Sequence, residues 1–573
     1  MFTKLGTKPL TCLLAVLGTF SHVGCSTDTA DTTNNSVGNT AGSAAGGPSV
    51  AGSAGSAGTV GASGAAAAPG AAPHVVLDDG ELAGSVVKNV SQFLGIPYAK
   101  PPVAALRWRR PQKNDKWAGV RDATKFGPRC AQNASAVLMN AASPDEDCLY
   151  VNVWTPNLTP AAPLPVMFWI HGGGNQNGSA NEPVPYAGSG LFYSGQFMAE
   201  SQGVVVVTLN YRLGAFGFFT NAALDQEEGG VSGNQGLWDQ TLALQWAQAN
   251  VAKFGGDPKN VTIYGESAGS LDVCLHVASP KSRGLFTKAI SQSGGCATKN
   301  TLKAAAATTA DTFATGLGCT GATALECLRA KPVADILGLV TTSAARFGNI
   351  VDGEFLPKQP RELFDAGDVA KVPYILGSNT DEGTLFTLTT SVPTEEALKT
   401  SLMTTFPGAD IAAILAAYPL SNFASQPNPL QAALARIVGD AQLVCSTWDA
   451  AARMEKLGAG VWMYNFDVPV VIATMPNLGL GASHGAELSY VFQTSPAFTA
   501  EQVTLSNTMQ TYWANFAKTG DPNGGSLLAW PKFTEAASTR INFAIAPTIV
   551  EAFRKTECQF WRARYDAQFA AAP

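Results

Sequence analysis

The stretch Thr262-Ile-Tyr-Gly-Glu-Ser-Ala-Gly269 contains a G-x-S-x-G pentapeptide, with Ser267 between two glycines. The residues before it, 261–264, favour a β-strand, and the Ala-rich segment 268–278 favours a helix. A serine on such a strand-to-helix turn holds its hydroxyl clear of the sheet, because the glycines leave out side chains that would block the turn. The pattern predicts a nucleophile. A glycine-rich turn without chemistry is the alternative, so a base, an acid and an oxyanion site must be found elsewhere in the chain.

Short apolar runs on both sides of this turn have the composition of buried parallel strands. Between two of them lies an amphipathic segment, 237–254, which ends at two glycines and is typical of a helix. Strand, helix, strand, serine turn and helix in succession predict an α/β fold, with a mostly parallel central sheet covered by helices on both faces. We expect helical, cap-like insertions at 304–345 and 391–443. The apolar runs are 166–170, 204–208, 261–264, 372–376 and 461–466.

A serine hydroxyl needs a base to take its proton, and the chain has only five histidines. One lies in the N-terminal leader, one at the edge of a tether, and one opens a glycine run. A fourth follows Ser267 on the expected helix, about 13 Å along its axis, which is too far for a hydrogen bond. This leaves His484, on a glycine-bearing loop after the expected strand 461–466. The four set aside are His22, His74, His171 and His276.

The acid is expected after another strand. Gly377-Ser-Asn-Thr-Asp-Glu-Gly383 follows the run 372–376 and offers Asp381 and Glu382, between which the residues alone do not choose. The chain order of serine, carboxylate and histidine is that of α/β-hydrolases and differs from the order in chymotrypsin-like and subtilisin-like proteases.

The glycine run His171-Gly-Gly-Gly174 follows the expected strand 166–170. Consecutive glycines can direct backbone N–H groups at a developing negative charge without obstruction by Cβ atoms. Together with the N–H of Ala268, those of Gly173 and Gly174 would make a three-donor oxyanion site. The alternative, a phosphate-binding loop, lacks the lysine and the Ser/Thr of a P-loop.

The N-terminal part differs from this globular body. Residues 1–25 have a positive start and an apolar run too short to span a bilayer, so they predict an export signal. This signal ends in Val23-Gly-Cys-Ser26, which resembles a bacterial lipoprotein cleavage box with Cys25 as the lipidated residue; ordinary secretion is the alternative. Residues 26–73 contain no aromatic residue and no Lys or Arg, which predicts a flexible tether. Residues 74–573 then form one large domain, in the bacterial cell envelope or secreted.

Composition restricts the partners. The 573 residues carry a net charge of -6, which argues against binding to nucleic acid or to an anionic membrane surface. Membrane attachment is therefore expected only through a lipid on Cys25. Eight cysteines lie beyond the leader, and an even number in an exported chain suggests disulfides. No C-x-x-C pair or Cys/His cluster is present, so we expect no metal, and serine chemistry needs no cofactor.

With these features the chain resembles the type-B carboxylesterase/lipase family, which includes cholinesterases and fungal lipases, within the α/β-hydrolase fold. The likeness extends from about residue 75 to the end. It is carried by Gln92-Phe-Leu-Gly-Ile-Pro-Tyr98, Glu146-Asp-Cys-Leu-Tyr-Val-Asn-Val-Trp154, Asn210-Tyr-Arg-Leu-Gly-Ala-Phe-Gly-Phe218, Asn234-Gln-Gly-Leu-Trp-Asp-Gln240 and Phe254-Gly-Gly-Asp-Pro258, besides the serine turn.

The resemblance implies a serine carboxylesterase in which Ser267 is the nucleophile, His484 the base and Glu382, rather than Asp381, the acid. It also matches Gly173, Gly174 and Ala268 to the oxyanion positions, and Glu266 and Ser293 to supporting positions. It further implies the disulfides Cys130–Cys148, Cys319–Cys327 and Cys445–Cys558, and leaves open whether Cys274 and Cys296 pair.

Two departures from the family bear on the substrate, which we expect to be a small-molecule ester. Residues 131–147 contain no aromatic residue, so the tryptophan that holds a quaternary ammonium in cholinesterases is missing. Relatives often have an aromatic residue after the glycine run, whereas this chain has Asn175-Gln-Asn-Gly178, which suggests a more polar wall near the entrance. A lipase for longer acyl chains, or a non-catalytic surface adhesion domain, are the alternatives.

Overall fold

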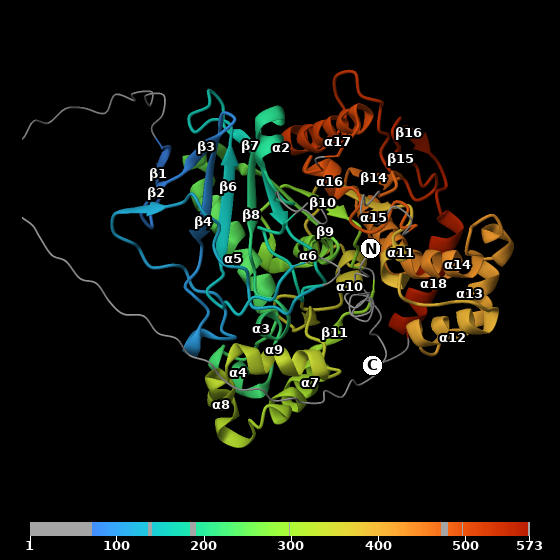
Figure 1. Cartoon of the computed structure of the whole chain (residues 1–573), viewed down its shortest axis with the longest axis horizontal. Helices are drawn as coiled ribbons and strands as arrows, with labels where there is room; N and C mark the ends of the chain where they lie inside the picture. The colour runs from blue at the N-terminus through green and yellow to red at the C-terminus, as the bar shows by residue number, and fades with distance from the viewer. Residues whose placement is uncertain are drawn as a thin grey trace, which may run out of the picture. The chain divides into compact units, whose positions relative to one another are not determined.

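A computed structural model describes residues 72–135, 140–183, 191–296, 298–470, 479–495 and 497–570. The expected export signal lies outside these ranges, together with Cys25 and all but the last two residues of the expected tether. Helices and strands are named below as in Figure 1.

An eleven-stranded mixed sheet forms the centre of the fold (Figure 1). Its middle strands, in the order β8-β7-β9-β10-β13-β14-β15, are all parallel to their neighbours. Antiparallel pairs complete the two edges. The strands are β3 (Ser85–Val87), β4 (Val90–Pro97), β6 (Tyr150–Thr155), β7 (Leu164–Ile170), β8 (Val205–Leu209), β9 (Gly256–Glu266), β10 (Lys288–Gln292), β13 (Tyr374–Asn379), β14 (Val461–Phe466), β15 (Arg540–Phe543) and β16 (Thr548–Val550).

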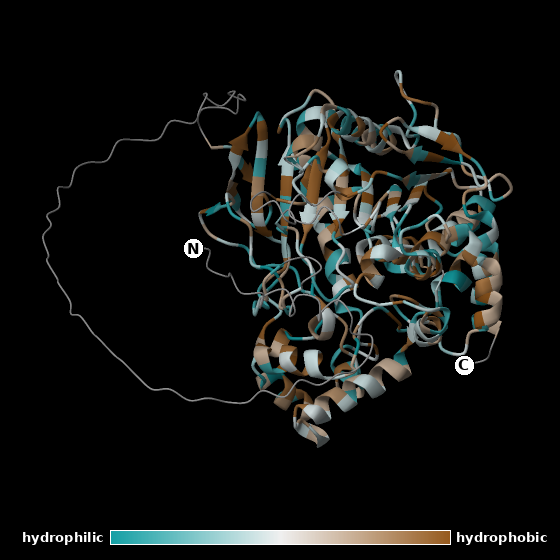
Figure 2. Ribbon diagram, turned by 45° about the vertical axis from the view of Figure 1, so that its right-hand side comes forward, coloured by the Kyte–Doolittle hydropathy of each residue, from teal (hydrophilic) through white to brown (hydrophobic). Residues whose placement is uncertain are grey.

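Helices cover both faces of this sheet, because successive side chains of a buried strand point to opposite sides. On β9, Ile263 packs into one apolar cluster and Tyr264 into another. Figure 2 shows the strands of the central sheet mostly in brown, as expected for strands buried on both faces. One face is covered by α5 (Gln235–Asn250), α6 (Ala268–Ala278), α10 (Pro360–Asp365) and α15 (Cys445–Lys456), and the other by α2 (Gln196–Gln202), α16 (Leu488–Val491) and α17 (Ala500–Thr519).

The two expected insertions are helical. In the second, α14 packs on α11, the short helix that begins directly after Glu382, and a Cβ added to Gly383 would lie 1.8 Å from the carbonyl oxygen of Ala435. The remaining helices are α3 (Gly214–Gly217), α4 (Ala222–Glu227), α7 (Lys303–Gly316), α8 (Ala324–Ala330), α9 (Val333–Thr342), α11 (Gly383–Thr387), α12 (Glu395–Thr405), α13 (Ile411–Ala417), α14 (Pro429–Gly439) and α18 (Lys555–Ala570). Small sheets are formed by β1 (His74–Val76), β2 (Glu81–Ala83) and β5 (Val120–Asp122), and by β11 (Thr301–Leu302) and β12 (Ile350–Val351).

The predicted fold class is confirmed, and the helix expected at 268–278 has these bounds in α6. The apolar pattern missed β10, which follows α6 and lies beside β9. Its sequence, Lys-Ala-Ile-Ser-Gln, is largely polar, yet all five residues are buried. A polar strand is stable here because both neighbours in the sheet satisfy its backbone, which no local pattern records.

Four disulfides are formed among the cysteines that the structure describes. The three pairs implied by the resemblance are confirmed, and Cys274 and Cys296 form a fourth bond, which ties α6 to the loop after β10. This number of disulfides is typical of proteins from oxidising compartments. Among the described residues, no helix has the length and apolarity needed to cross a bilayer.

Candidate active site

Ser267 stands on the turn between β9 and α6, with φ 56° and ψ -121°. Such a backbone conformation costs about 1–3 kcal/mol and persists only where its surroundings enforce it. Here the N–H of Ser267 donates to the carbonyl oxygen of Gln292 at 2.9 Å. Packing leaves no room for side chains on the flanking glycines: a Cβ on Gly269 would lie 2.1 Å from the carbonyl oxygen of Ile170, and one on Gly265 would lie 2.5 Å from the carbonyl oxygen of Gly269. The glycines are therefore required for the turn, as predicted.

His484 and Glu382 are in direct contact although they are 102 residues apart. Nδ1 of His484 lies 2.7 Å from Oε2 of Glu382, and the other carboxylate oxygen accepts the N–H of Asn379 at 2.7 Å. Both side chains are buried. A carboxylate at Nδ1 favours the tautomer with its proton there, so Nε2 is left to accept a proton from another group.

The neighbouring carboxylate, Asp381, has a different contact. Its Oδ2 accepts the N–H of Ala482 at 3.0 Å, and its own N–H donates to the carbonyl oxygen of Ala482 at 2.9 Å. Asp381 thus joins the loop after β13 to the histidine loop, whereas Glu382 faces the imidazole. Of the two adjacent carboxylates between which the residues alone do not choose, Glu382 is the one that contacts the imidazole.

Nε2 of His484 lies 3.2 Å from Oε1 of Glu266, the residue before Ser267. No hydrogen bond joins Nε2 to the Ser267 hydroxyl in the described part of the chain. The histidine loop packs on the serine turn, since a Cβ on Gly485 would lie 3.6 Å from Oε1 of Glu266. In unliganded enzymes such catalytic hydrogen bonds are often long and shorten only when substrate is bound.

The charges around the imidazole are unusual because they are buried. Burial raises the pKa of Glu266 to about 8, against the opposing effect of His484. Burial by itself lowers the pKa of His484, but the nearby carboxylates of Glu266, Glu382 and Glu487 outweigh it and raise this pKa to about 9. Burial, with Glu382 nearby, also raises the pKa of Glu487. The site therefore holds a proton more tightly than a free imidazole does.

The glycine run after β7 contains backbone N–H groups that are not bonded to other described residues. Gly173 and Gly174 have φ values of 104° and 67°, in the region that favours glycine. Within the described residues neither N–H donates to a protein acceptor. Ala268 is the first residue of α6, so its N–H has no partner within the helix. These three amides are available to an oxyanion.

Asn175 does not form the polar wall that we expected. It is 3% exposed, and its side-chain amide is bonded to Asp272, Asn349 and Tyr211. For Asn175 the prediction was wrong because its side chain is turned into the protein; Gln176 and Asn177, which belong to the same stretch, are partly exposed.

Two residues at the site were missed by the sequence argument. The ring of Phe386, 41% exposed, lies 4.9 Å from the imidazole of His484. Glu487 is fully buried and accepts from Asn379 at 2.6 Å. Both follow a predicted residue at helical spacing, four after Glu382 and three after His484, and this spacing is the signal that would have found them.

Ser293 lies behind the site, on the loop after β10. It has φ 58°, it is fully buried, and its N–H donates to the carbonyl oxygen of Gly377 at 2.8 Å. Its hydroxyl has no partner among the described residues. In the same ranges, no group of three or more His, Cys, Asp and Glu side chains is arranged to hold a metal ion.

Comparison with known proteins agrees with this geometry. Residues 71–561 match the model of the carboxylesterase family. The chain is 35% identical over 516 residues to a cholinesterase from Mus musculus, and the match covers 83% of each protein. The chain therefore belongs to the carboxylesterase family and is a carboxylic ester hydrolase.

Proposed function

We propose that hydrolysis proceeds through an acyl-enzyme on Ser267, with His484 as the base and Glu382 as the acid that orients it. His484 Nε2 takes the proton of the serine hydroxyl as the oxygen attacks the ester carbonyl. The imidazolium then gives this proton to the departing alcohol, and water attacks the acyl-enzyme by the same route.

The observation that carries this proposal is the buried 2.7 Å contact between Nδ1 of His484 and Glu382. A carboxylate there stabilises the imidazolium that forms in each half of the reaction and holds the ring in the reactive tautomer. The strained, half-buried position of Ser267 supports it further, because Glu266, the residue before it, lies 3.2 Å from Nε2 of His484.

The oxyanion of each tetrahedral intermediate would be bound by the N–H groups of Gly173, Gly174 and Ala268. Their freedom from other acceptors supports this role. Removal of one such donor typically lowers the rate about 10²–10³-fold.

For the substrate, we favour uncharged esters. The mouse relative is named a cholinesterase, but residues 131–147 of this chain contain no aromatic residue that could hold a quaternary ammonium. Phe386, half-exposed beside His484, offers an apolar surface to the substrate. A series of p-nitrophenyl esters from acetate to palmitate, with triglyceride emulsions in parallel, would separate an esterase for short acyl chains from a lipase.

Export is likewise a proposal, and the four disulfides support it. The intact mass of the mature protein tests attachment to the cell envelope. A start at Cys25 with added acyl chains supports the lipid anchor, and a bare polypeptide mass contradicts it.

The replacement Ser267→Ala tests the nucleophile. We expect kcat for p-nitrophenyl butyrate to fall on the order of 10⁶-fold, and labelling by a fluorophosphonate probe to disappear. The control Ser201→Ala changes an exposed serine on α2 and should keep both. Full residual activity of Ser267→Ala would refute the proposal, and a wild-type protein that neither hydrolyses esters nor takes the label would favour the non-catalytic adhesion alternative.

A further inference from the structure

We propose that Asn175 and Asp272 form a positioning pair that holds the glycine loop, residues 171–175, at a set distance from the helix that begins after Ser267. This inference rests on the proposed function, because it assigns the pair a part in binding the oxyanion.

The pair joins the two segments that supply the proposed oxyanion donors. Asn175 directly follows Gly174, and Asp272 lies on α6, five residues after Ser267. Nδ2 of Asn175 donates to Oδ1 of Asp272 at 3.0 Å. Asp272 is fully buried and Asn175 is 3% exposed, so water does not compete for this bond.

Asn175 is held at three further points. Its Oδ1 accepts the hydroxyl of Tyr211 at 2.9 Å, its carbonyl oxygen accepts the N–H of Gly214 at 2.7 Å, and its Nδ2 also donates to Oδ1 of Asn349 at 3.2 Å. Its backbone has φ 56°. Asparagine tolerates this left-handed conformation better than most residues. The end of the glycine loop is therefore clamped through side chain and backbone together.

Asp272 accepts the last hydrogen bond of a chain in which every donor faces toward Asp272. Its Oδ2 accepts from Nε2 of Gln240 at 2.6 Å, so Oε1 of Gln240 must accept from Nε2 of His276 at 2.8 Å. Nδ1 of His276 then accepts from the hydroxyl of Ser282 at 2.6 Å. Burial lowers the pKa of His276 to about 3, so the ring stays neutral and the order of donors is kept.

Asn349 completes the set by donating to Oδ1 of Asp272 at 2.9 Å. Three side-chain amides thus converge on one carboxylate, and only one of them, from Asn175, belongs to the glycine loop. His276, which we excluded as the base, instead links Ser282 to Gln240 in the row of hydrogen bonds that ends at Asp272.

The mechanical consequence follows from the glycines. Gly172, Gly173 and Gly174 have no side chains to pack, so their amides are positioned by backbone contacts, such as the N–H groups of Gln176 and Asn177 on the carbonyl oxygen of Gly173, and by what holds the ends of the loop. Asn175 is the side chain that holds one of these ends. Oxyanion donors must be placed to within about 0.5 Å to be effective. Loss of the pair should therefore weaken binding of the transition state more than binding of the substrate, and so lower kcat with little change in KM.

The variant Asn175→Asp tests this with almost no change in shape. It replaces an amide donor with a carboxyl group that faces Asp272, so the bond becomes a repulsion at a pH where both carboxyl groups are ionised. We expect kcat for p-nitrophenyl butyrate to fall on the order of 10²-fold, as for loss of one oxyanion donor, while KM changes less than about threefold. A kcat within twofold of wild type would overturn the inference.

The swap Asn175→Asp with Asp272→Asn provides the rescue. Nδ2 of the new amide would donate to the new carboxylate, its oxygen would still accept from Gln240, and Asn349 can turn its amide to match. We expect the double variant to recover kcat to within about tenfold of wild type. A double variant as slow as Asn175→Asp alone would contradict a positioning pair.

The matched control is Asp352→Asn. Asp352 is also buried, and it accepts an asparagine amide, from Asn234 at 2.9 Å, but it contacts no residue of the glycine loop. We expect it to lower Tm while kcat stays within twofold. If Asp352→Asn lowers kcat as much as Asn175→Asp does, the effect of the pair is general destabilisation and the inference fails.

Failure of the inference is distinguishable from failure of the proposed function. Wild-type protein must first hydrolyse the ester and take a fluorophosphonate label at Ser267; if it does not, the proposed function fails. If it does, and Asn175→Asp is as fast as wild type, only the positioning pair is wrong.

Discussion

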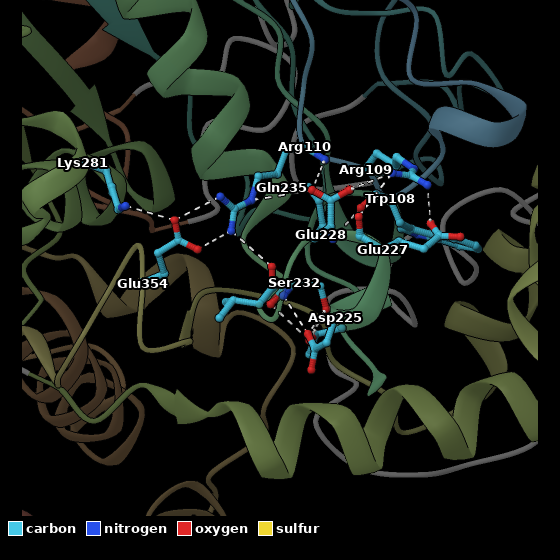
Figure 3. Close-up of polar contacts among 12 residues, drawn as sticks. Trp108, Arg109, Arg110, Asp225, Glu227, Glu228, Ser232, Gln235, Lys281 and Glu354 are labelled. Carbon is cyan, nitrogen blue, oxygen red and sulfur yellow. Dashed lines mark hydrogen bonds and ion pairs between the residues drawn. The ribbon is translucent and has the colours of Figure 1, made fainter. Parts of the chain in front are cut away.

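Burial raises the pKa values of Glu266 and Glu487 near His484, whereas hydrogen bonds from arginines lower those of Glu354 and Glu227 in the cluster around Arg110. At the proposed active site, burial raises the pKa of Glu266 to about 8. In the second cluster, shown in Figure 3, Glu354 lies between Arg110 and Lys281, and hydrogen bonds from Arg110 are the largest cause that lowers its pKa to about 2. Glu227, which accepts two bonds from Arg329, is shifted downward as well.

The difference lies in what surrounds each carboxylate. In the Arg110 cluster the carboxylates meet arginine and lysine side chains and remain partly open to water, which stabilises the ionised form. Around His484, Glu266 and Glu382 both contact the imidazole in a closed interior, and Glu487 is buried nearby, bonded to Gln292 and Asn379. Burial therefore raises the pKa values of Glu266 and Glu487, and groups perturbed in this way are typical of catalytic sites.

The largest effect should come from loss of the contact between the carboxylate of Glu382 and the imidazole of His484. We expect Glu382→Gln to lower kcat on the order of 10⁴-fold, because an amide at this place loses the charge that stabilises the imidazolium and can favour the wrong tautomer. Steady-state hydrolysis of p-nitrophenyl butyrate measures this.

The adjacent variant Asp381→Asn is the control for that experiment. Its amide oxygen can still accept the N–H of Ala482, so we expect kcat to fall by less than about tenfold. The reverse ranking of the two variants would show that Asp381 is the acid.

An intermediate effect is expected on the pH profile. His484 can act as base only when it is neutral, and the nearby carboxylates raise its pKa to about 9, so activity should fall as pH decreases through the alkaline range. Glu266→Gln removes the carboxylate that raises the pKa of His484 most. The pKa of His484 should then decrease, and the acid limb of kcat/KM should move to lower pH by on the order of one unit.

The measurement is kcat/KM from pH 5 to 10 for both proteins. An acid limb that stays in place, or moves to higher pH in the variant, would contradict the proposed coupling of Glu266 and His484. Asn175→Asp, which leaves these charges unchanged, should show the wild-type limb at a lower rate.

The smallest effect is expected in the Arg110 cluster. The pKa of Glu354 is lowered from 4.5 to about 2, so its ion pairs stabilise the fold above about pH 4.5 and lose this contribution as pH falls toward 2. Because the pairs are partly exposed, Glu354→Gln should cost no more than about 1 kcal/mol at neutral pH, and kcat should not change.

Thermal unfolding at pH 7 and at pH 3 measures the contribution of the Glu354 ion pairs to stability. The difference in Tm between wild type and Glu354→Gln should shrink at the lower pH and in high salt. Glu326→Gln, at an exposed position on α8 with no ion pair among the described contacts, should behave as wild type at both pH values. If Glu354→Gln lowered Tm more at pH 3 than at pH 7, the predicted pH dependence would be contradicted.

Much of the site was predictable because each part follows a strand. Ser267, the glycine run and the Asp381–Glu382 loop all lie at carboxyl ends of parallel strands, which meet at one edge of the sheet. His484 was found by elimination among five histidines. The polar strand β10 and the inward orientation of Asn175 were not predictable, because neither burial nor side-chain direction on a loop has a local signature.

The amino-acid sequence by itself indicated the alternation of strands and helices around the serine turn and the side chains that we propose to react, since these depend on apolar spacing and on glycines that local backbone geometry requires. Only the tertiary structure decided which of two adjacent carboxylates meets His484, that Cys274 pairs with Cys296, and that Asn175 turns toward Asp272. These choices depend on distances between segments far apart in the chain, and such distances exist only after the sheet has assembled.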